Sequence, residues 1–202
     1  GPPLPGPSFH GAASVAGGRI YVTGGQGAEQ AVGSVYVMEV TPAGPGEWRE
    51  LAPLPAPRSH HASAVHGGAL WLVGGLQGHP ARGPTPLFDV LRAEILEDGT
   101  LGPWRSVSLM PHSYATHSAF FHDDALWVLG GVEDNRRFVD AVWRAAVDGE
   151  GRLGEWERVE PGLPSPRAHV HVTPVVGGRV YSVGGSASRQ ARAAVDIGEL
   201  RP

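Results

Sequence analysis

A hydrogen-bonding side chain recurs at one position in four similar segments of the chain, and the residues are His10, His60, Thr116 and His169. His61 and His117 take the next position in two segments, and His171 lies two residues beyond His169. Neutral imidazole donates and accepts hydrogen bonds, and it becomes a cation below its reference pKa of about 6.5. These residue types predict a site for a polar or anionic ligand.

Two arginines and a tyrosine stand two positions before the recurring residue. Arg58 and Arg167 have this place in two segments, and Tyr114 has it in a third. A guanidinium presents a fixed fork of donors that suits a carboxylate or a phosphate. We therefore predict that these residues and the histidines contact a ligand. The alternative is that the pattern places a polar side chain there for a structural reason.

The composition excludes several functional classes. All 16 basic residues are arginine, which excludes a lysine Schiff base and a P-loop lysine. The absence of cysteine excludes disulfides, thiolate catalysis and cysteine–zinc sites. A net charge of −4 provides no basic field for nucleic acid, and no apolar run approaches the about 20 residues of a membrane span. We expect neither nucleic acid nor a membrane as a partner.

Neither a metal nor a cofactor is expected. Zinc holds its ligand nitrogens at about 2 Å, and the histidines come from separate segments of the chain. His169 and His171 alone form a weak signal for a metal.

A repeat must position these side chains. Three sequence markers recur in the same order at intervals of roughly 50 residues: a Leu-Pro or Met-Pro pair, a glycine pair and a tryptophan. The first two markers occur four times and the tryptophan three times. The glycine pairs are Gly24-Gly25, Gly74-Gly75, Gly130-Gly131 and Gly184-Gly185. Leu-Pro or Met-Pro opens each unit, and a tryptophan follows the first three glycine pairs at positions 48, 104 and 156.

The second unit shows what each repeat forms. We expect strands over 62–66, 69–73, 90–96 and 104–107, with tight turns at Gly67-Gly68 and Asp98-Gly99. Four antiparallel strands in about 50 residues are typical of a β-propeller blade. The predicted fold class is therefore all-β, with one propeller domain over 1–202 and blades at approximately 4–53, 54–108, 109–162 and 163–202.

The motif resembles the Kelch repeat, in all four units and over nearly the whole chain. The second unit has Leu54-Pro55, Pro57-Arg58, a strand, a glycine pair and a strand that ends in Gly74-Gly75. The resemblance implies blades around a central channel with the first strand of each blade innermost. It also implies that the recurring histidines lie at the rim of the channel mouth. Kelch-repeat proteins include peptide-binding adaptors, scaffolds and a minority of enzymes.

The fourth unit lacks the sequence of an outer strand, because a fourth tryptophan would fall beyond position 202. Three alternatives follow: a closed four-bladed ring, an open fragment, or part of a larger propeller completed by a second copy or by further sequence. An open fragment would expose an apolar face and a strand edge. We favour a partner at this edge, so a homo-oligomer is one expectation.

The loops between the second and third strands of each unit are the most variable parts of the repeat, and they span 26–33, 76–89, 132–140 and 186–192. Strand order places them on the same face as the Leu-Pro segments. Binding residues concentrate on loops that a rigid scaffold carries. The candidate ligand-binding residues in these loops are Arg82, Arg136, Arg137 and Arg189.

The predicted function is a binding or scaffold module that engages a peptide, protein or glycan through this face. The alternative is an epimerase-, mutarotase- or lyase-like enzyme that acts on a small polar ligand, such as a sugar, in the channel mouth. No catalytic residue can be assigned, because no serine–histidine–aspartate or paired-carboxylate motif is present. A buried carboxylate beside His60 or His169 would favour the enzyme.

Overall fold

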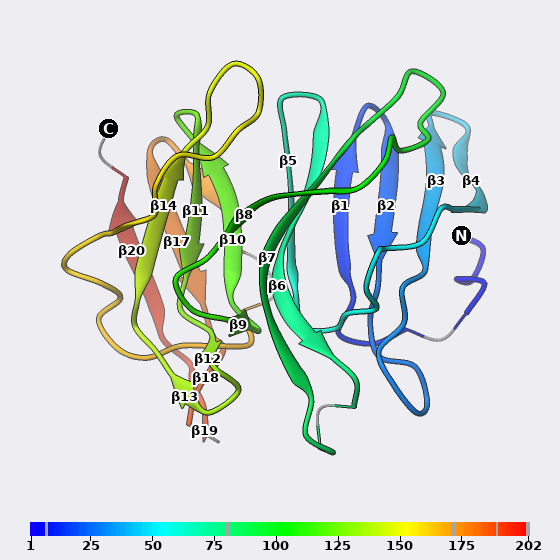
Figure 1. Cartoon of the computed structure of the whole chain (residues 1–202). Helices are drawn as coiled ribbons and strands as arrows, with labels where there is room; N and C mark the ends of the chain where they lie inside the picture. The colour runs from blue at the N-terminus through cyan, green and yellow to red at the C-terminus, as the bar shows by residue number, and fades with distance from the viewer. Residues whose placement is uncertain (7, 80, 171–172, 189, 201–202) are drawn as a thin grey trace.

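The computed structural model describes residues 1–6, 8–79, 81–170, 173–188 and 190–200 (Figure 1). All regular elements of this part of the chain are β-strands, and the main sheets are antiparallel. None of the described residues forms a helix of the length and apolarity that crossing a membrane requires. The all-β propeller fold predicted from the repeats is confirmed.

Three sheets have four strands in sequential order, and we call them blades 1, 2 and 3. Blade 1 contains β1 (Ala12–Ala16), β2 (Arg19–Thr23), β3 (Val35–Thr41) and β4 (Gly44–Leu51). Blade 2 contains β5 (Ala62–His66), β6 (Ala69–Gln77), β7 (Thr85–Glu94) and β8 (Arg105–Leu109). Blade 3 contains β10 (Ser118–His122), β11 (Ala125–Leu129), β14 (Val142–Ala146) and β15 (Glu157–Arg158).

Blade 4 has three strands among the described residues: β16 (Val175–Val176), β17 (Arg179–Val183) and β20 (Val195–Glu199). Short strands build the loops: β9 (Tyr114–Ala115), β12 (Val132–Glu133), β13 (Arg137–Phe138), β18 (Ser186–Ala187) and β19 (Gln190–Ala191). The hairpin turns lie at one end of the blades, and the loops after the second strands lie at the other end, at the bottom of Figure 1. We call the latter end the loop face.

Tight turns join the first two strands of each blade because their residues accept positive φ angles. Gly67 and Gly68 have φ angles of 55° and 68°, and Asp123 and Asp124 take the same conformation in blade 3 with 46° and 50°. Both central residues of a type I′ hairpin turn need positive φ, which glycine and aspartate tolerate better than most residues.

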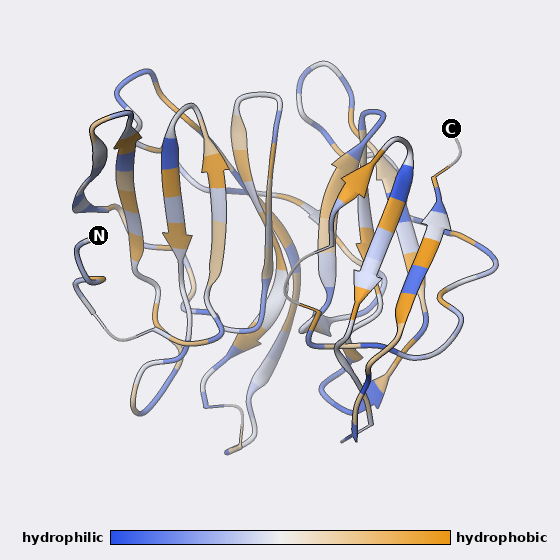
Figure 2. Cartoon of the chain, turned by 180° about the vertical axis from the view of Figure 1, so that it is seen from behind, coloured by the Kyte–Doolittle hydropathy of each residue, from blue (hydrophilic) through white to orange (hydrophobic). Residues whose placement is uncertain are grey.

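Aromatic residues of the second strands seal the contacts between blades. Trp71 of blade 2 is 1% exposed and its ring lies 5.2 Å from that of Phe121 in blade 3. Trp127 of blade 3 shares a hydrophobic cluster with Val180 of blade 4. Hydrophobic and hydrophilic residues alternate along β17 and β20 of blade 4 (Figure 2), whereas β6 and β11 are continuous apolar runs, as expected for strands that are covered on both faces.

The glycine pairs exist because neighbouring blades approach each other closely at the loop face. Gly74 has a φ of 56°, and a Cβ atom added there would lie 2.6 Å from the carbonyl oxygen of Tyr114. The amide of Gly131 donates a 2.7 Å hydrogen bond to the carbonyl of Arg167 in the next unit. A side chain at these points would push the blades apart, so the pairs fix the spacing of the channel.

Candidate ligand-binding face

The recurring residues His10, His60, Thr116 and His169 lie around one cavity of about 390 Å³ at the loop-face end of the channel. We call these four the rim residues and the cavity the channel pocket. Main-chain hydrogen bonds connect them from blade to blade: His60 N to His10 O at 2.8 Å, Thr116 N to His60 O at 2.8 Å and His169 N to Thr116 O at 2.9 Å. The four rim residues, which have the same position in the repeat, thus also have the same position relative to the pocket, one in each blade.

Each rim residue has a left-handed backbone conformation. Their φ angles are 55°, 59°, 56° and 57° in chain order. This region is uncommon for residues other than glycine, although histidine is enriched among the exceptions. Such a conformation costs of order 1 kcal/mol and persists where the surrounding structure imposes it. Here the main-chain hydrogen bonds between blades impose it.

His60 lies at the centre of the described rim. Its ring centroid is 4.0 Å from that of His10, and its Nδ1 lies 2.9 Å from the hydroxyl of Ser59. Burial, together with the neighbouring rings of His10 and His169, lowers the pKa of His60 to about 4. His60 is therefore neutral at pH 7.

His61 and His117 form a second, buried layer of the channel pocket. His61 is 6% exposed and His117 is 5% exposed. The Nε2 of His61 lies 3.0 Å from the hydroxyl of Thr23, whereas its Nδ1 has no hydrogen-bond partner among the residues that the structure describes.

The two buried rings are neutral at pH 7. Burial lowers the pKa of His61 to about 3, and the Arg58 charge adds to this effect. Burial lowers the pKa of His117 to about 4, and a hydrogen bond with the main chain of Val73 opposes that shift.

Arg58 and Arg167 do not lie at the channel mouth, which corrects the prediction that they contact a ligand there. Arg58 is 0% exposed and its two terminal nitrogens donate to both carboxylate oxygens of Asp89 at 2.9 Å. Arg167 is 1% exposed, pairs with Asp196 and donates to the carbonyl of Ser182 at 3.0 Å. A buried guanidinium needs a carboxylate to offset its desolvation, and each pair clamps one blade internally.

Tyr114 is also buried and does not line the channel pocket, contrary to its prediction as a mouth contact. Its hydroxyl oxygen accepts a 2.8 Å hydrogen bond from Nε1 of Trp143. Burial raises the pKa of Tyr114 to about 12, so the hydroxyl stays protonated. Trp143 of β14 therefore serves to hold this tyrosine.

The loop arginines lie in different surroundings. Arg82 is exposed and forms a 3.4 Å ion pair with Glu29 of the preceding loop. Arg136, Arg137 and Arg192 line a groove of about 650 Å³ between the loops of blades 3 and 4, together with Phe138. We call this the loop groove. The predicted contacts His171 and Arg189 lie outside the described residues.

The loop groove adjoins the channel pocket through one aromatic contact. The ring of Phe138 lies 6.4 Å from that of the rim residue His169. Arg137 donates to both carboxylate oxygens of Glu133 at 3.0 Å, and Arg192 donates to the hydroxyl of Ser165 at 2.8 Å. Arg136 is exposed, and no ion pair to its guanidinium occurs within the described ranges.

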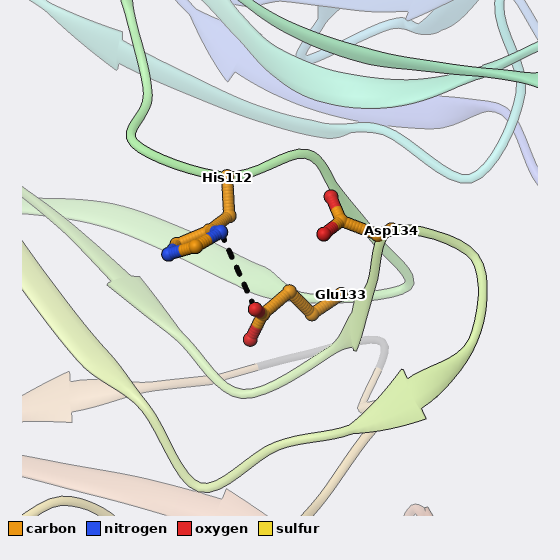
Figure 3. Close-up of side chains that lie close together, drawn as sticks. All are labelled: His112, Glu133 and Asp134. Atoms are coloured by element: carbon orange, nitrogen blue, oxygen red, sulfur yellow. Dashed lines mark ion pairs between the residues drawn. The ribbon is translucent and has the colours of Figure 1, made fainter.

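A cluster of His112, Glu133 and Asp134 was not found from the sequence (Figure 3). The Nδ1 of His112 lies 3.3 Å from a carboxylate oxygen of Glu133, and Ser113 donates to Asp134 at 2.8 Å. The three potential ligand atoms lie within 4.8 Å of one another. Arg137 already neutralises Glu133, however, so the cluster also explains how this arginine is held beside the groove.

Two acidic residues were missed as partners of the buried arginines. Asp89 and Asp196 lie within otherwise apolar segments, between Phe88 and Val90 and between Val195 and Ile197. A charge inside an apolar strand is the signal that could have identified them, because such a charge needs a buried partner. No carboxylate lines the channel pocket among the residues that the structure describes.

The comparisons with known proteins concern most of the chain. The model of the KLHDC2/KLHL20/DRC7 Kelch-repeats domain matches residues 1–185. The solved structure of YjhT is similar with a TM-score of 0.76 and 18% sequence identity, and the match covers 100% of this chain and 67% of YjhT. At this identity the likeness concerns the fold. The comparison with curated proteins gave no match.

Proposed function

Because this chain belongs to the Kelch-repeat family, we propose that it is a binding module that engages an acidic segment of a protein partner through the loop groove. The loop groove is the observation that carries this proposal. Three arginines from two blades surround it, and an aromatic side chain forms part of its wall. Arginine and aromatic residues are enriched where protein interfaces gain most of their binding energy.

The charge of the groove is local, because the whole chain carries a net charge of −4. Arg137 is balanced by Glu133, whereas Arg192 donates to the uncharged hydroxyl of Ser165 and keeps its charge. The positive charge at the groove therefore comes from Arg192 and from the more exposed guanidinium of Arg136. Its fork of donors suits the carboxylates of aspartate or glutamate. Phe138 lies beside it and offers an apolar surface for a neighbouring side chain of the partner.

The geometry gives the enzyme alternative no comparable support. The described lining of the channel pocket contains imidazole and hydroxyl groups but no carboxylate. General acid–base catalysis at a sugar carbon needs a group poised to exchange a proton near the working pH. His60, with a pKa lowered to about 4, is a weak base at neutral pH. Binding therefore describes this face better than catalysis.

The test is fluorescence anisotropy with a labelled glutamate-rich peptide and a lysine-rich peptide of equal length. We expect the acidic peptide to bind and the Arg136→Glu variant to weaken its affinity at least about tenfold, because reversal replaces an attraction by a repulsion. Arg105→Glu is the matched control, since this exposed arginine lies on the outer strand β8, away from the loop face. Equal loss in both variants, or equal binding of both peptides, would contradict the proposal.

A further inference from the structure

The channel pocket contains buried polar atoms that the groove does not use. The Nδ1 of His61 has no hydrogen-bond partner among the residues that the structure describes, and His61 and His117 are both more than nine-tenths buried and line the pocket. Leaving a buried polar atom unpaired costs about 1–3 kcal/mol, so such atoms indicate a missing water or ligand. Two adjacent blades thus each place a buried imidazole in the lining of one cavity, and the imidazole of His61 has an unpaired nitrogen.

The rim gives a second, independent observation. All four rim residues adopt φ angles between 55° and 59°, where glycine is free of strain, yet each carries a side chain able to form hydrogen bonds. Strained residues of this kind cluster at ligand-binding sites. Three of the four are histidines, and they surround the pocket mouth.

We propose that the channel pocket is a binding site for a small oxyanion, a carboxylate or phosphate group, and that the rim imidazoles take up a proton when the anion binds. The groups that face the site favour this class of ligand. The titratable residues of its described lining are His10, His60, His61, His117 and His169. Behind them, the Arg58 charge acts on His61.

The proton follows from electrostatics. The imidazoles of His10 and His60, whose ring centroids lie 4.0 Å apart, cannot both hold a charge without a counter-ion. An anion between them removes that penalty, stabilises one imidazolium and offers an acceptor for its N–H. Thermodynamic linkage then requires that the affinity rise as pH falls, by up to about tenfold per pH unit for each proton taken up.

The experiment is an NMR titration of the whole chain with sodium phosphate and, separately, with sodium acetate at pH 7.5 and 5.5. We expect at least one anion to shift the imidazole signals of rim residues, with an affinity at least about tenfold higher at the lower pH. The ratio between phosphate and acetate identifies the preferred oxyanion. Affinity that is independent of pH, or that rises with pH, would overturn the proposal, as would the absence of binding at tens of millimolar.

The His60→Gly variant separates binding from folding. Glycine suits the φ of 59° at this position, so we expect stability to be unchanged or raised while the pH dependence of binding is lost. Thr116→Gly is the matched control, because it makes the same backbone change at the rim without removing an imidazole. If both variants retain the pH-dependent affinity, the rim does not hold the anion.

The Arg136→Glu variant distinguishes this site from the loop groove. We expect it to retain the pH-dependent binding of phosphate or acetate, because Arg136 does not line the channel pocket. Loss of anion binding in this variant would assign the anion to the groove and contradict a separate channel site. Loss of acidic-peptide binding alone leaves the channel site intact.

Discussion

Blades 2 and 4 are built from the same sequence signals, but blade 2 has a neighbour on both sides. In β6 of blade 2, every residue from Ala69 to Leu76 is buried. In β17 and β20 of blade 4, only one face is covered, and the opposite face leaves Val183 and Ile197 53% and 61% exposed. The repeat sequence therefore determines the strands of each blade, whereas the burial of their side chains depends on whether a neighbouring blade packs against them.

Aromatic truncation should separate the two blades most strongly. Trp71 fills the contact between blades 2 and 3, so Trp71→Ala is expected to lower the free energy of unfolding by about 3–5 kcal/mol. Tyr181 has the same place in blade 4 and is half-buried, so Tyr181→Ala should cost less than half as much. Urea denaturation of both variants measures this. Equal losses would show that blade 4 is covered in solution.

Loss of the buried ion pair is expected to destabilise blades 2 and 4 by similar amounts. Arg58→Ala leaves the Asp89 carboxylate without its partner, and Arg167→Ala does the same to Asp196. Breaking a buried pair costs about 3–5 kcal/mol, somewhat less here because each carboxylate is partly exposed. Chemical denaturation should show a clear loss in both, and the double variant Arg58→Met with Asp89→Val should recover most of it. A stable Arg58→Ala protein would return this residue to the list of ligand contacts.

Acid should affect blades 2 and 3 through a group that blade 4 lacks. Val170 follows the rim residue of blade 4, where blades 2 and 3 have His61 and His117. The folded-state pKa of His117 is lowered to about 4, so the unfolded chain binds more protons and stability falls as pH drops below about 6.5. His117→Val should remove about 2 kcal/mol of this loss at pH 5. Unfolding curves at pH 7.5 and 5 test it, and an unchanged slope would contradict the assigned neutral ring.

The smallest effect is expected on the open face of blade 4. Ile197→Thr should change the free energy of unfolding by less than about 0.5 kcal/mol, because the side chain contacts solvent. It should also reduce self-association measured by light scattering, since an exposed apolar face promotes it. A loss above about 1 kcal/mol that depends on protein concentration would mean that a second copy covers this face.

Much of the fold was predictable because its signals are local. The glycine pairs and hairpin turns depend on φ angles and close approaches that leave marks in the sequence, as at Gly74 and Gly67. The equivalence of the rim residues followed from the same repeat. The number of blades in the complete propeller did not, because it depends on the angle between sheets rather than on any one residue.

The site was predictable only in part, because residue type does not reveal direction. Arg58 and His60 are two positions apart, yet the arginine turns into its own blade and the histidine lines the channel pocket. The carboxylate that holds the Arg58 side chain inside the blade belongs to Asp89, 31 positions after Arg58 in the sequence. The His112–Glu133 contact likewise joins two separate loops. Long-range partners of this kind leave weak signals in a single sequence.

The hydrogen bonds that connect the rim residues use only main-chain atoms. The joint between successive blades at the channel mouth therefore needs a residue that accepts a positive φ angle but no particular side-chain functional group, as Thr116 among histidines illustrates. The side chain at the rim can therefore be changed in one blade while the main-chain hydrogen bonds between blades are kept. The rim side chains, which determine ligand preference, can therefore differ between blades, whereas the main-chain hydrogen bonds that hold the blades together stay the same.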